Sequence, residues 1–387
     1  MSNSNNSSGE SLKVAIVGHV DHGKSTLVGR LFLDTGSLPE GKFEAIQAMC
    51  ERRGMPFEWA FLMDALQAER DQGVTIDTSQ IWFRTDKRGY VIIDAPGHKE
   101  FLKNMITGAA ASDAALLLID AEEGIREQSR RHGYLLHLLG VRQVMVVVNK
   151  MDLVDYDRDR FEAIEQDYRA YLSEIGVTPL NFIPVSARQG DNIATGSEAM
   201  AWYQGPTILQ ALDDFQVITQ PDDLPLRFPV QDVYRFDERR IIAGRIESGT
   251  LRVGDNLLFS PANRMGKVKS IEAWSVSARP LQAKAGDSIG ITLEEQIFVE
   301  RGDIASHEDN APIESDVFRA RLFWLGDRDV AVGSRYTMKL NTADVAVTVQ
   351  SIDRVIDTGD LSTKDATAVA RNEVAEITLR ADTMLAL

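Results

Sequence analysis

The sequence predicts an α/β domain, with a mostly parallel sheet and helices on both faces, followed by a second half built from β-strands. In the first half, five short runs rich in Val, Ile and Leu alternate with segments of helical periodicity. Uninterrupted apolar runs are typical of parallel strands buried on both faces, and their alternation with helices is typical of doubly wound folds. Beyond residue 220, short strand-like segments separated by Gly-Asp turns replace the helical patterns, which favours β-barrels.

The apolar runs define the predicted strands of the first half. The runs are VAIV at 14–17, YVII at 90–93, ALLLI at 115–119, VMVVV at 144–148 and NFIPV at 181–185. The alternating stretch SQIWFRT comes shortly before YVII and predicts an edge strand. The segment RFEAIEQDYRAYLSEIG has apolar residues at helical spacing and reaches Gly176, a residue type that commonly follows the C-terminus of a helix.

Changes in composition along the chain predict the domain boundaries. Residues 1–11 are polar and predict a disordered tail, and residues 12–219 form the predicted α/β domain. The segment QPDDLPLRFP contains three prolines and predicts a linker at the start of a β-barrel domain, residues 220–310. A second break near Asn310-Ala311-Pro312 separates this domain from a further β-barrel domain, residues 311–387.

Composition and charge limit the classes of function. The chain has 387 residues, 44% of them hydrophobic and 26% charged, as in ordinary soluble globular proteins. No apolar run approaches the roughly 20 residues that a membrane span needs, and a single cysteine, Cys50, fits a reducing cytoplasm. The net charge of −16 argues against nucleic acid as a partner, because phosphate backbones favour proteins with surplus Lys and Arg.

Four of the five apolar runs lead directly into a polar motif. The motifs are GHVDHGKS after VAIV, DAPGH after YVII, NKMD after VMVVV and SAR after NFIPV. Ligands bind at the carboxyl ends of the strands in open α/β sheets. The sequence therefore predicts that the four motifs converge on one crevice.

The first motif fits the phosphate-loop pattern G-x-x-x-x-G-K-[ST]. Its glycines let the backbone approach phosphates closely, and the N–H groups at the start of the following helix face the anion. We expect Lys24 to reach the β- and γ-phosphates and Ser25 to bind Mg²⁺; the alternative is an ordinary glycine-containing turn between strand and helix. The predicted nucleotide-contacting residues of this stretch are Gly18, Asp21, Gly23, Lys24, Ser25 and Thr26.

The second motif and a nearby threonine predict the γ-phosphate end of the site. Asp94, at a strand end, is expected to hold Mg²⁺ through water, and Gly97 to offer its N–H to the γ-phosphate. Thr75 is expected to close on Mg²⁺ as part of a switch segment, and His98 to orient the attacking water. The alternatives are an Asp-Pro-Gly turn, a solvated strand start and a histidine without a catalytic role.

The last two motifs predict which base is bound. Guanine presents two hydrogen-bond donors on one edge, and the carboxylate of Asp152 can accept both, whereas adenine offers an acceptor at that place. A site built for one pattern rejects the other strongly. Asn149 is expected to brace the base region, Lys150 to stack its stem over the ring, and Ser186-Ala187 to bring a backbone N–H to the guanine oxygen. The sequence therefore predicts GTP rather than ATP.

Together the motifs resemble those of the translation-factor class of GTPases. The resemblance rests on GHVDHGKST, QGVTID, DAPGHKEFLKNMITGAA and NKMDLV, and GRIESGTLRVGD resembles the second domain of these factors. It implies a P-loop GTPase domain followed by two β-barrel domains. The last of these is expected to be incomplete at Leu387, either because this is a truncated copy or because the parent protein is longer. The resemblance also implies that Val20 and Val74 gate His98.

Within this class, the sequence most resembles the large, GTP-hydrolysing subunit of bacterial sulfate adenylyltransferase. The segments that carry this resemblance are SARQGDNIATGSEAMAWYQGPTIL, FLMDALQAERDQGVTID, RRHGYLLHLLGVRQVMVVVNKMDLVDY and LRFPVQDV. It implies that GTP hydrolysis drives the formation of adenylyl sulfate and pyrophosphate from ATP and sulfate. That chemistry would belong to a small catalytic subunit, the expected partner, with nucleic acid not expected.

Three alternatives stay open at this point. The histidines of GHVDHGKST and the motif DAPGHKEFLKNMITG are closer to an elongation factor that carries aminoacyl-tRNA. The chain could also be a relative recruited to another pathway. A third alternative is a scaffold that binds GTP without hydrolysing it, against which His98 and Thr75 argue.

Overall fold

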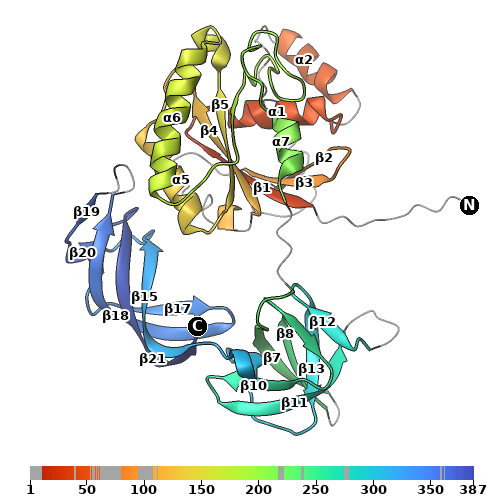
Figure 1. The fold of residues 1–387 in the computed structure, drawn as a ribbon, viewed down its shortest axis with the longest axis vertical. Coiled ribbons are helices and arrows are strands. Elements are labelled where there is room, and N and C mark those ends of the chain that lie inside the picture. The colour runs from red at the N-terminus through yellow and green to blue at the C-terminus, as the bar shows by residue number, and fades with distance from the viewer. Residues whose placement is uncertain are drawn as a thin grey trace, which may run out of the picture. The chain divides into compact units, whose positions relative to one another are not determined.

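A computed structural model describes the chain in two compact units (Figure 1). The first unit comprises Met1–Val217 with Thr358–Asp360, and the second comprises Ile218–Asp357 with Leu361–Leu387. The described residues are 11–38, 41–52, 54, 57, 59, 61, 80–94, 108–110, 112–216, 222–236, 239–273, 279–357, 360 and 362–387.

The first unit is built on a six-stranded sheet of order β2-β3-β1-β4-β5-β6. Neighbouring strands are parallel except for β2, which pairs antiparallel with β3 at the edge. The mostly parallel sheet and the predicted edge strand are confirmed. The strands are β1 (Leu12–Gly18), β2 (Gln80–Arg84), β3 (Gly89–Asp94), β4 (Ala114–Asp120), β5 (Gln143–Asn149) and β6 (Asn181–Pro184).

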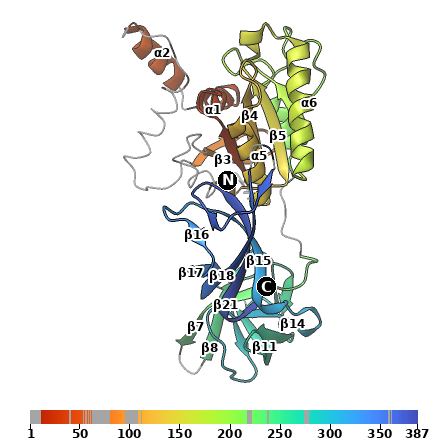
Figure 2. The ribbon, with the colours of Figure 1, turned by 90° about the vertical axis from the view of Figure 1, so that its left-hand side faces the viewer.

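Helices cover both faces of this sheet, as predicted. In Figure 1, α5 and α6 lie on one side of the sheet and α1 and α7 on the other, and α1 and α6 again flank it in Figure 2. The Tyr168 hydroxyl of α6 donates to the Ser129 carbonyl of α5 over 2.5 Å, which joins the two helices on their shared face. The helices are α1 (Lys24–Asp34), α2 (Lys42–Arg52), α5 (Glu127–Leu138), α6 (Arg158–Glu174) and α7 (Ile208–Asp214).

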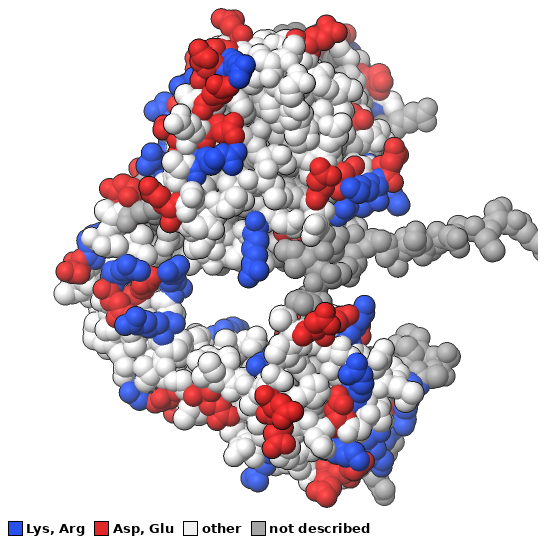
Figure 3. Space-filling view, viewed as in Figure 1, with Lys and Arg blue, Asp and Glu red and all other residues white. Residues whose placement is uncertain are grey.

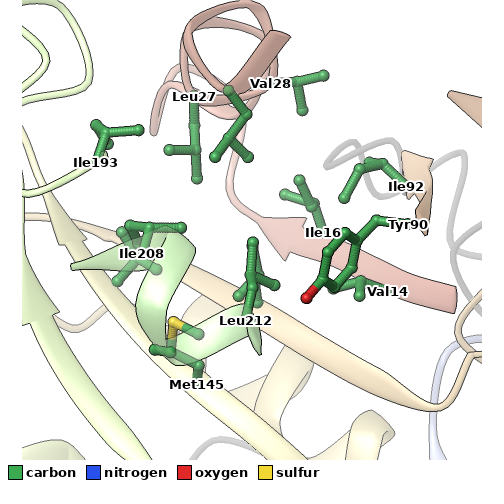
Figure 4. Packing of buried hydrophobic residues seen from close by; sticks show 14 of the residues in the cluster. Val14, Ile16, Leu27, Val28, Tyr90, Ile92, Met145, Ile193, Ile208 and Leu212 are labelled. Atoms are coloured by element: carbon green, nitrogen blue, oxygen red, sulfur yellow. The ribbon is translucent and has the colours of Figure 1, made fainter. Parts of the chain in front are cut away.

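The core of the first unit follows from the two-residue repeat of a strand. Alternate residues of β1, β4 and β5 point to the same face, and one such set packs against α1 and α7 (Figure 4). Every residue of β4 is buried, so both of its faces are covered. This explains why residues 114–119 form an uninterrupted apolar run, with Asp120 as the polar residue at the strand end. Members of the cluster labelled in Figure 4 include Val14, Ile16, Leu27, Ile92, Met145, Ile208 and Leu212.

The second unit contains a closed barrel of order β10-β11-β13-β8-β7-β14. Phe228, Val230, Phe259 and Ile271 lie in its core and are each at most 1% exposed. The predicted barrel after the α/β domain is therefore confirmed. Its strands are β7 (Phe228–Phe236), β8 (Arg239–Arg245), β10 (Asn256–Ser260), β11 (Arg264–Glu272), β13 (Ser288–Leu293) and β14 (Ile304–His307), with β9 (Thr250–Arg252) paired to β12 (Gln282–Lys284).

The Gly-Asp pairs of the sequence form turns of one design. Gly254, Gly286 and Gly302 all have positive φ, between 90° and 101°, a region that glycine adopts without strain. In each case the following aspartate accepts a hydrogen bond from the backbone N–H three residues before it, at 2.8 to 3.0 Å. The first two turns connect β9 to β10 and β12 to β13, and the third directly precedes β14.

The C-terminal part of the second unit is also β-structure. A five-stranded sheet has the order β15-β21-β18-β17, with β19 paired to β18, and β16 pairs with β20. Strand β21 lies between β15 and β18, in the interior of the sheet. The strands are β15 (Glu314–Phe323), β16 (Val330–Ala331), β17 (Arg335–Leu340), β18 (Ala343–Ile356), β19 (Thr363–Lys364), β20 (Ala368–Val369) and β21 (Val374–Ala386).

The domain limits and the truncation of the last domain stay predictions.

Basic and acidic side chains are interspersed on both units on the face shown in Figure 3, so the charge of −16 is not gathered into one area there. Within the described ranges, no helix is long and apolar enough to cross a membrane.

Because β4 lies in the middle of the sheet, the stability of the first unit should depend strongly on its buried side chains. Replacing Leu116, which is fully buried, by Ala should lower the free energy of unfolding by about 2–5 kcal/mol, because a cavity remains in a packed core. Urea unfolding followed by the helical circular dichroism signal measures this, since the described α-helices α1, α2, α5, α6 and α7 all belong to the first unit. The matched control is Leu180→Ala, at a position 53% exposed, and an equal loss in both variants would contradict the assignment.

Candidate nucleotide-binding site

The carboxyl ends of the parallel strands bring the sequence motifs together. Gly18, the last residue of β1, is in register with Leu118 of β4, and Asp120 at the end of β4 is in register with Asn149 at the end of β5. Because GHVDHGKS follows β1, NKMD spans the end of β5 and SAR follows β6, three of the four motifs lie at one edge of the sheet. The fourth begins at Asp94, which ends β3 beside β1.

The phosphate loop has a backbone that only some residues can adopt. Gly23 has φ of 88° and Asp21 has φ of 65°, both in the left-handed region. A Cβ at Gly23 would lie 2.3 Å from Nδ2 of Asn149, and a Cβ at Gly18 would lie 3.0 Å from the Leu118 carbonyl oxygen. The two motif glycines are thus required by conformation or by close approach to neighbouring strands.

The start of α1 is arranged to face an anion. Its N-cap is Gly23, which makes no side-chain cap hydrogen bond, and the first turn of this fully described helix contains no acidic residue. The first N–H groups of a helix have no partner within the helix and carry partial positive charge. Ser25 is exposed and Thr26 is partly buried in this first turn. An uncapped helix N-terminus after a glycine loop is suited to bind phosphate.

Lys24 closes the loop on itself. Its ammonium donates to the carbonyl oxygens of Gly18 and His19, each at 2.8 Å. These bonds place a positive charge inside the curve of the loop, beside the helix N-terminus. The arrangement fits the phosphate-binding role that the sequence predicts for Lys24.

Asn149 joins the phosphate loop to the motifs that follow β5 and β6. Its side-chain amide donates to the His22 carbonyl at 2.9 Å, and its side-chain oxygen accepts from the Ala187 N–H at 2.9 Å. The side chain is 2% exposed, so both bonds are made away from solvent. This geometry supports the bracing role predicted for Asn149. The N–H of Ala187 donates to Asn149; the backbone N–H that Ser186-Ala187 is predicted to bring to the guanine oxygen stays a prediction.

A hydrogen bond and an ion pair orient the side chains that are predicted to contact the base. The Ser186 hydroxyl donates to Oδ1 of Asp152 at 2.7 Å, which orients the carboxylate. Lys150 has φ of 64°, and its ammonium forms an ion pair with Asp120 at 2.7 Å. The structure thus brings Asn149, Lys150, Asp152, Ser186 and Ala187 together; their roles toward a base stay predictions.

The γ-phosphate end of the predicted site lies outside the described residues. This applies to Thr75, Gly97, His98 and Val74, and to the side chain of Asp94. Their roles stay predictions. Val20, the other residue predicted to gate His98, is partly buried in the described phosphate loop.

Two histidines, one in the phosphate loop and one on α5, are buried. His22 is fully buried and its Nδ1 lies 3.1 Å from the Leu118 carbonyl; burial outweighs this bond and lowers its pKa. His132, on α5, is 2% exposed, and burial lowers its pKa to about 3. Both rings are therefore neutral at ordinary pH.

Two residues of the site were missed by the sequence analysis. Asp120 directly follows the run ALLLI, and an aspartate at the end of a buried strand is the same signal that singled out Asp94. Arg30 of α1 donates to the Gln189 carbonyl at 3.3 Å, and its guanidinium fills the space where a Cβ of Gly190 would lie. No local pattern joins α1 to a turn some 160 residues later, so Arg30 could not be found from spacing.

Comparison with known proteins identifies relatives along most of the chain. Residues 9–217 match the family described as the elongation factor Tu GTP binding domain, and residues 317–387 match the GTP-eEF1A C-terminal domain-like family. Elongation factor 1-alpha of Natronomonas pharaonis is 38% identical over 376 residues, covering 95% of this chain and 89% of that protein. Elongation factor 1-alpha of Archaeoglobus fulgidus is 42% identical over 356 residues, covering 90% and 84%.

These relatives overturn the main functional prediction. They are named for translation and not for sulfate activation. The expectation of a sulfate adenylyltransferase subunit, with a small catalytic subunit as partner and no role for nucleic acid, is therefore wrong. The elongation-factor alternative and the prediction of a GTP-binding domain are the parts that the comparisons support.

The contact between Gly23 and Asn149 gives a test of the site. Gly23→Ala should lower the affinity for GTP at least tenfold, because the new methyl group would strain the positive φ and displace the Asn149 amide. Equilibrium binding of a fluorescent GTP analogue measures the effect. Gly36→Ala, also at positive φ but with no atom of the described residues within 4 Å of its Cβ, is the control, and a similar loss there would refute the specific role of Gly23.

Proposed function

The chain belongs to the translation-factor GTPase superfamily, which includes elongation factors Tu and 1-alpha, and we propose that it delivers aminoacyl-tRNA to the ribosome in a GTP-dependent cycle. The observation that carries the proposal is similarity to elongation factor 1-alpha over 95% of the chain. The hydrogen-bonded unit around Asn149 supports the nucleotide part of the proposal. The proposed location is the cytoplasm, where translation takes place.

In this proposal the described residues bind the two ends of GTP separately. The phosphate loop with Gly18, Asp21 and Gly23, and the first turn of α1 with Thr26, surround the phosphates with N–H groups. Lys24 contributes the positive charge. On the other side, Asp152 accepts the two donors of guanine while Lys150 covers one face of the ring. Asn149 keeps both halves at a fixed separation.

Mg²⁺ is the metal that the proposed site would use. The exposed hydroxyl of Ser25 at the start of α1 is an oxygen ligand of the kind that Mg²⁺ prefers, and Asp94, through water, and Thr75 are the proposed further ligands. The ion would neutralise charge on the phosphates. His98 is proposed to orient the attacking water, with Val20 and Val74 controlling its access.

The carboxylate of Asp152 should determine base specificity. Asp152→Asn replaces one acceptor by a donor, so it should weaken GTP and strengthen xanthosine triphosphate, whose ring carries a carbonyl where guanine carries an amine. A lost or mismatched buried hydrogen bond costs about 1–3 kcal/mol, or about ten- to a hundredfold in affinity. Competition binding measures the two constants.

The matched control for this change is Asp155→Asn. Asp155 is exposed, lies three residues beyond Asp152 and has φ of 52°, a conformation that asparagine adopts well. It should keep the preference for GTP. If both variants or neither changed specificity, Asp152 would not be the base-reading residue.

Binding of aminoacyl-tRNA is tested by protection of its ester bond. The chain with GTP should slow spontaneous hydrolysis of aminoacyl-tRNA, and the chain with GDP should not, because the proposed carrier releases its cargo after hydrolysis. Deacylated tRNA in excess should compete poorly. The Asp152→Asn variant should protect with xanthosine triphosphate instead of GTP, which ties the protection to this chain. Normal GTP binding without any protection would contradict tRNA delivery.

A further inference from the structure

Asp120 is a buried carboxylate at the centre of the candidate site. It is 2% exposed and ends β4, directly in register with Asn149 of the neighbouring β5. Its two carboxylate oxygens have different partners. Oδ2 accepts from the ammonium of Lys150 at 2.7 Å, and Oδ1 accepts from the backbone N–H groups of Glu122 and Glu123 at 2.8 and 3.3 Å.

The charge state of Asp120 follows from these partners. Burial alone would raise the pKa of its carboxyl group, but the hydrogen bonds from Lys150 and from the Glu122 N–H outweigh it and hold the pKa below its ordinary value. The carboxylate is therefore ionised, and a buried ionised group is tolerated only when it is paired. Lys150 supplies that charge.

The same ion pair restricts Lys150. The lysine starts a short helical turn, Met151–Val154, and its own backbone lies in the left-handed region with φ of 64°. Both ends of the side chain are thus fixed: the Cα by the backbone and the ammonium by Asp120 at the adjacent strand end. A lysine stem held at both ends loses the conformational freedom that a free surface lysine keeps.

We propose that Asp120 is a positioning residue that holds the ammonium of Lys150 so that the methylene stem of the lysine forms a preformed wall against the face of the guanine ring. The inference rests on the proposed function, because it requires a guanine nucleotide at the NKMD motif. Preforming this wall lowers the entropy that nucleotide binding must remove.

The wall contacts the face of the base and not its hydrogen-bonding edge. Asp120 therefore contributes to affinity for every purine nucleotide that the site accepts, while Asp152 selects among them. Loss of Asp120 should weaken GTP and inosine triphosphate, which lacks the exocyclic amine, by the same factor. The ratio of the two affinities should not change.

A competing route from Asp120 leads to the phosphate loop. Its bonds to the Glu122 and Glu123 N–H groups shape a turn, and the Glu123 carboxylate lies 3.5 Å from Nε2 of His22 in that loop. If Asp120 acted through this turn, its loss would weaken the binding of phosphates without a base. Inorganic tripolyphosphate is a probe for that route.

The test is a double-mutant cycle with Lys150. Asp120→Asn keeps an acceptor for the turn but removes the negative charge, and it should raise the dissociation constants of GTP and GDP about tenfold, equivalent to about 1.4 kcal/mol. The same change in a Lys150→Met background should have no further effect, because the contact that Asp120 orients is absent. Tripolyphosphate affinity should be unchanged.

Two further variants keep the test decisive. Asp120→Ser retains an acceptor for the turn but is too short to reach Lys150. It replaces Asp120→Asn if that variant fails to fold, and the same changes in affinity are expected of it. Glu127→Gln removes an ion pair of equal length, 2.7 Å to Arg131, at an exposed position of α5. This control should leave all nucleotide affinities unchanged.

The outcomes separate this inference from the proposed function. Equal losses for GTP and tripolyphosphate, or full additivity with Lys150→Met, would overturn the positioning role while GTP binding by the unchanged chain still stands. Unchanged GTP affinity in Asp120→Asn would overturn it as well. Failure of the unchanged chain to bind guanine nucleotides would refute the proposed function and, with it, the inference.

Discussion

The pair of hydrogen bonds made by the Asn149 side chain is the constraint on which the candidate site depends. One amide group holds the His22 carbonyl of the phosphate loop and the Ala187 N–H of the segment after β6. Because the amide is buried, breaking either bond leaves an unpaired polar group without water to replace it. Three motifs that lie far apart in the chain therefore keep a fixed mutual position, and the glycine beside them cannot be enlarged.

Burial of the parallel sheet makes this constraint possible. Strand β4 is covered on both faces, so its carboxyl end is held by packing as well as by its ladders to β1 and β5. Polar residues at such strand ends can be partly buried, and their interactions are stronger there than in water. Asp120 and Asn149, side by side in register, use this position for an ion pair and for a two-sided amide bridge.

The segment 186–209 shows why resemblance misled the functional prediction. In the structure it covers the edge of the sheet: the Tyr203 hydroxyl donates to the Phe182 carbonyl at 3.2 Å, and the Asn192 amide to the Pro184 carbonyl at 2.9 Å, both in β6. These bonds attach the segment to β6, the strand that leads into Ser186-Ala187. No sulfate chemistry is needed to explain them. The net charge of −16 was equally uninformative, because it sums over the whole surface and does not describe any one binding face.

The sequence by itself determined the order of strands and helices, the parallel sheet, the barrel and the motifs of the phosphate loop and base site. These follow from local rules: apolar runs for buried strands, positive φ at glycine, and motif spacing relative to strand ends. Only the tertiary structure decided the ion pair of Asp120 with Lys150, the contact of Arg30 with Gly190, and the donation of the Ala187 N–H to Asn149. Such pairs join residues 30 to 160 positions apart, and their contact depends on strand register and helix packing, which no local pattern records.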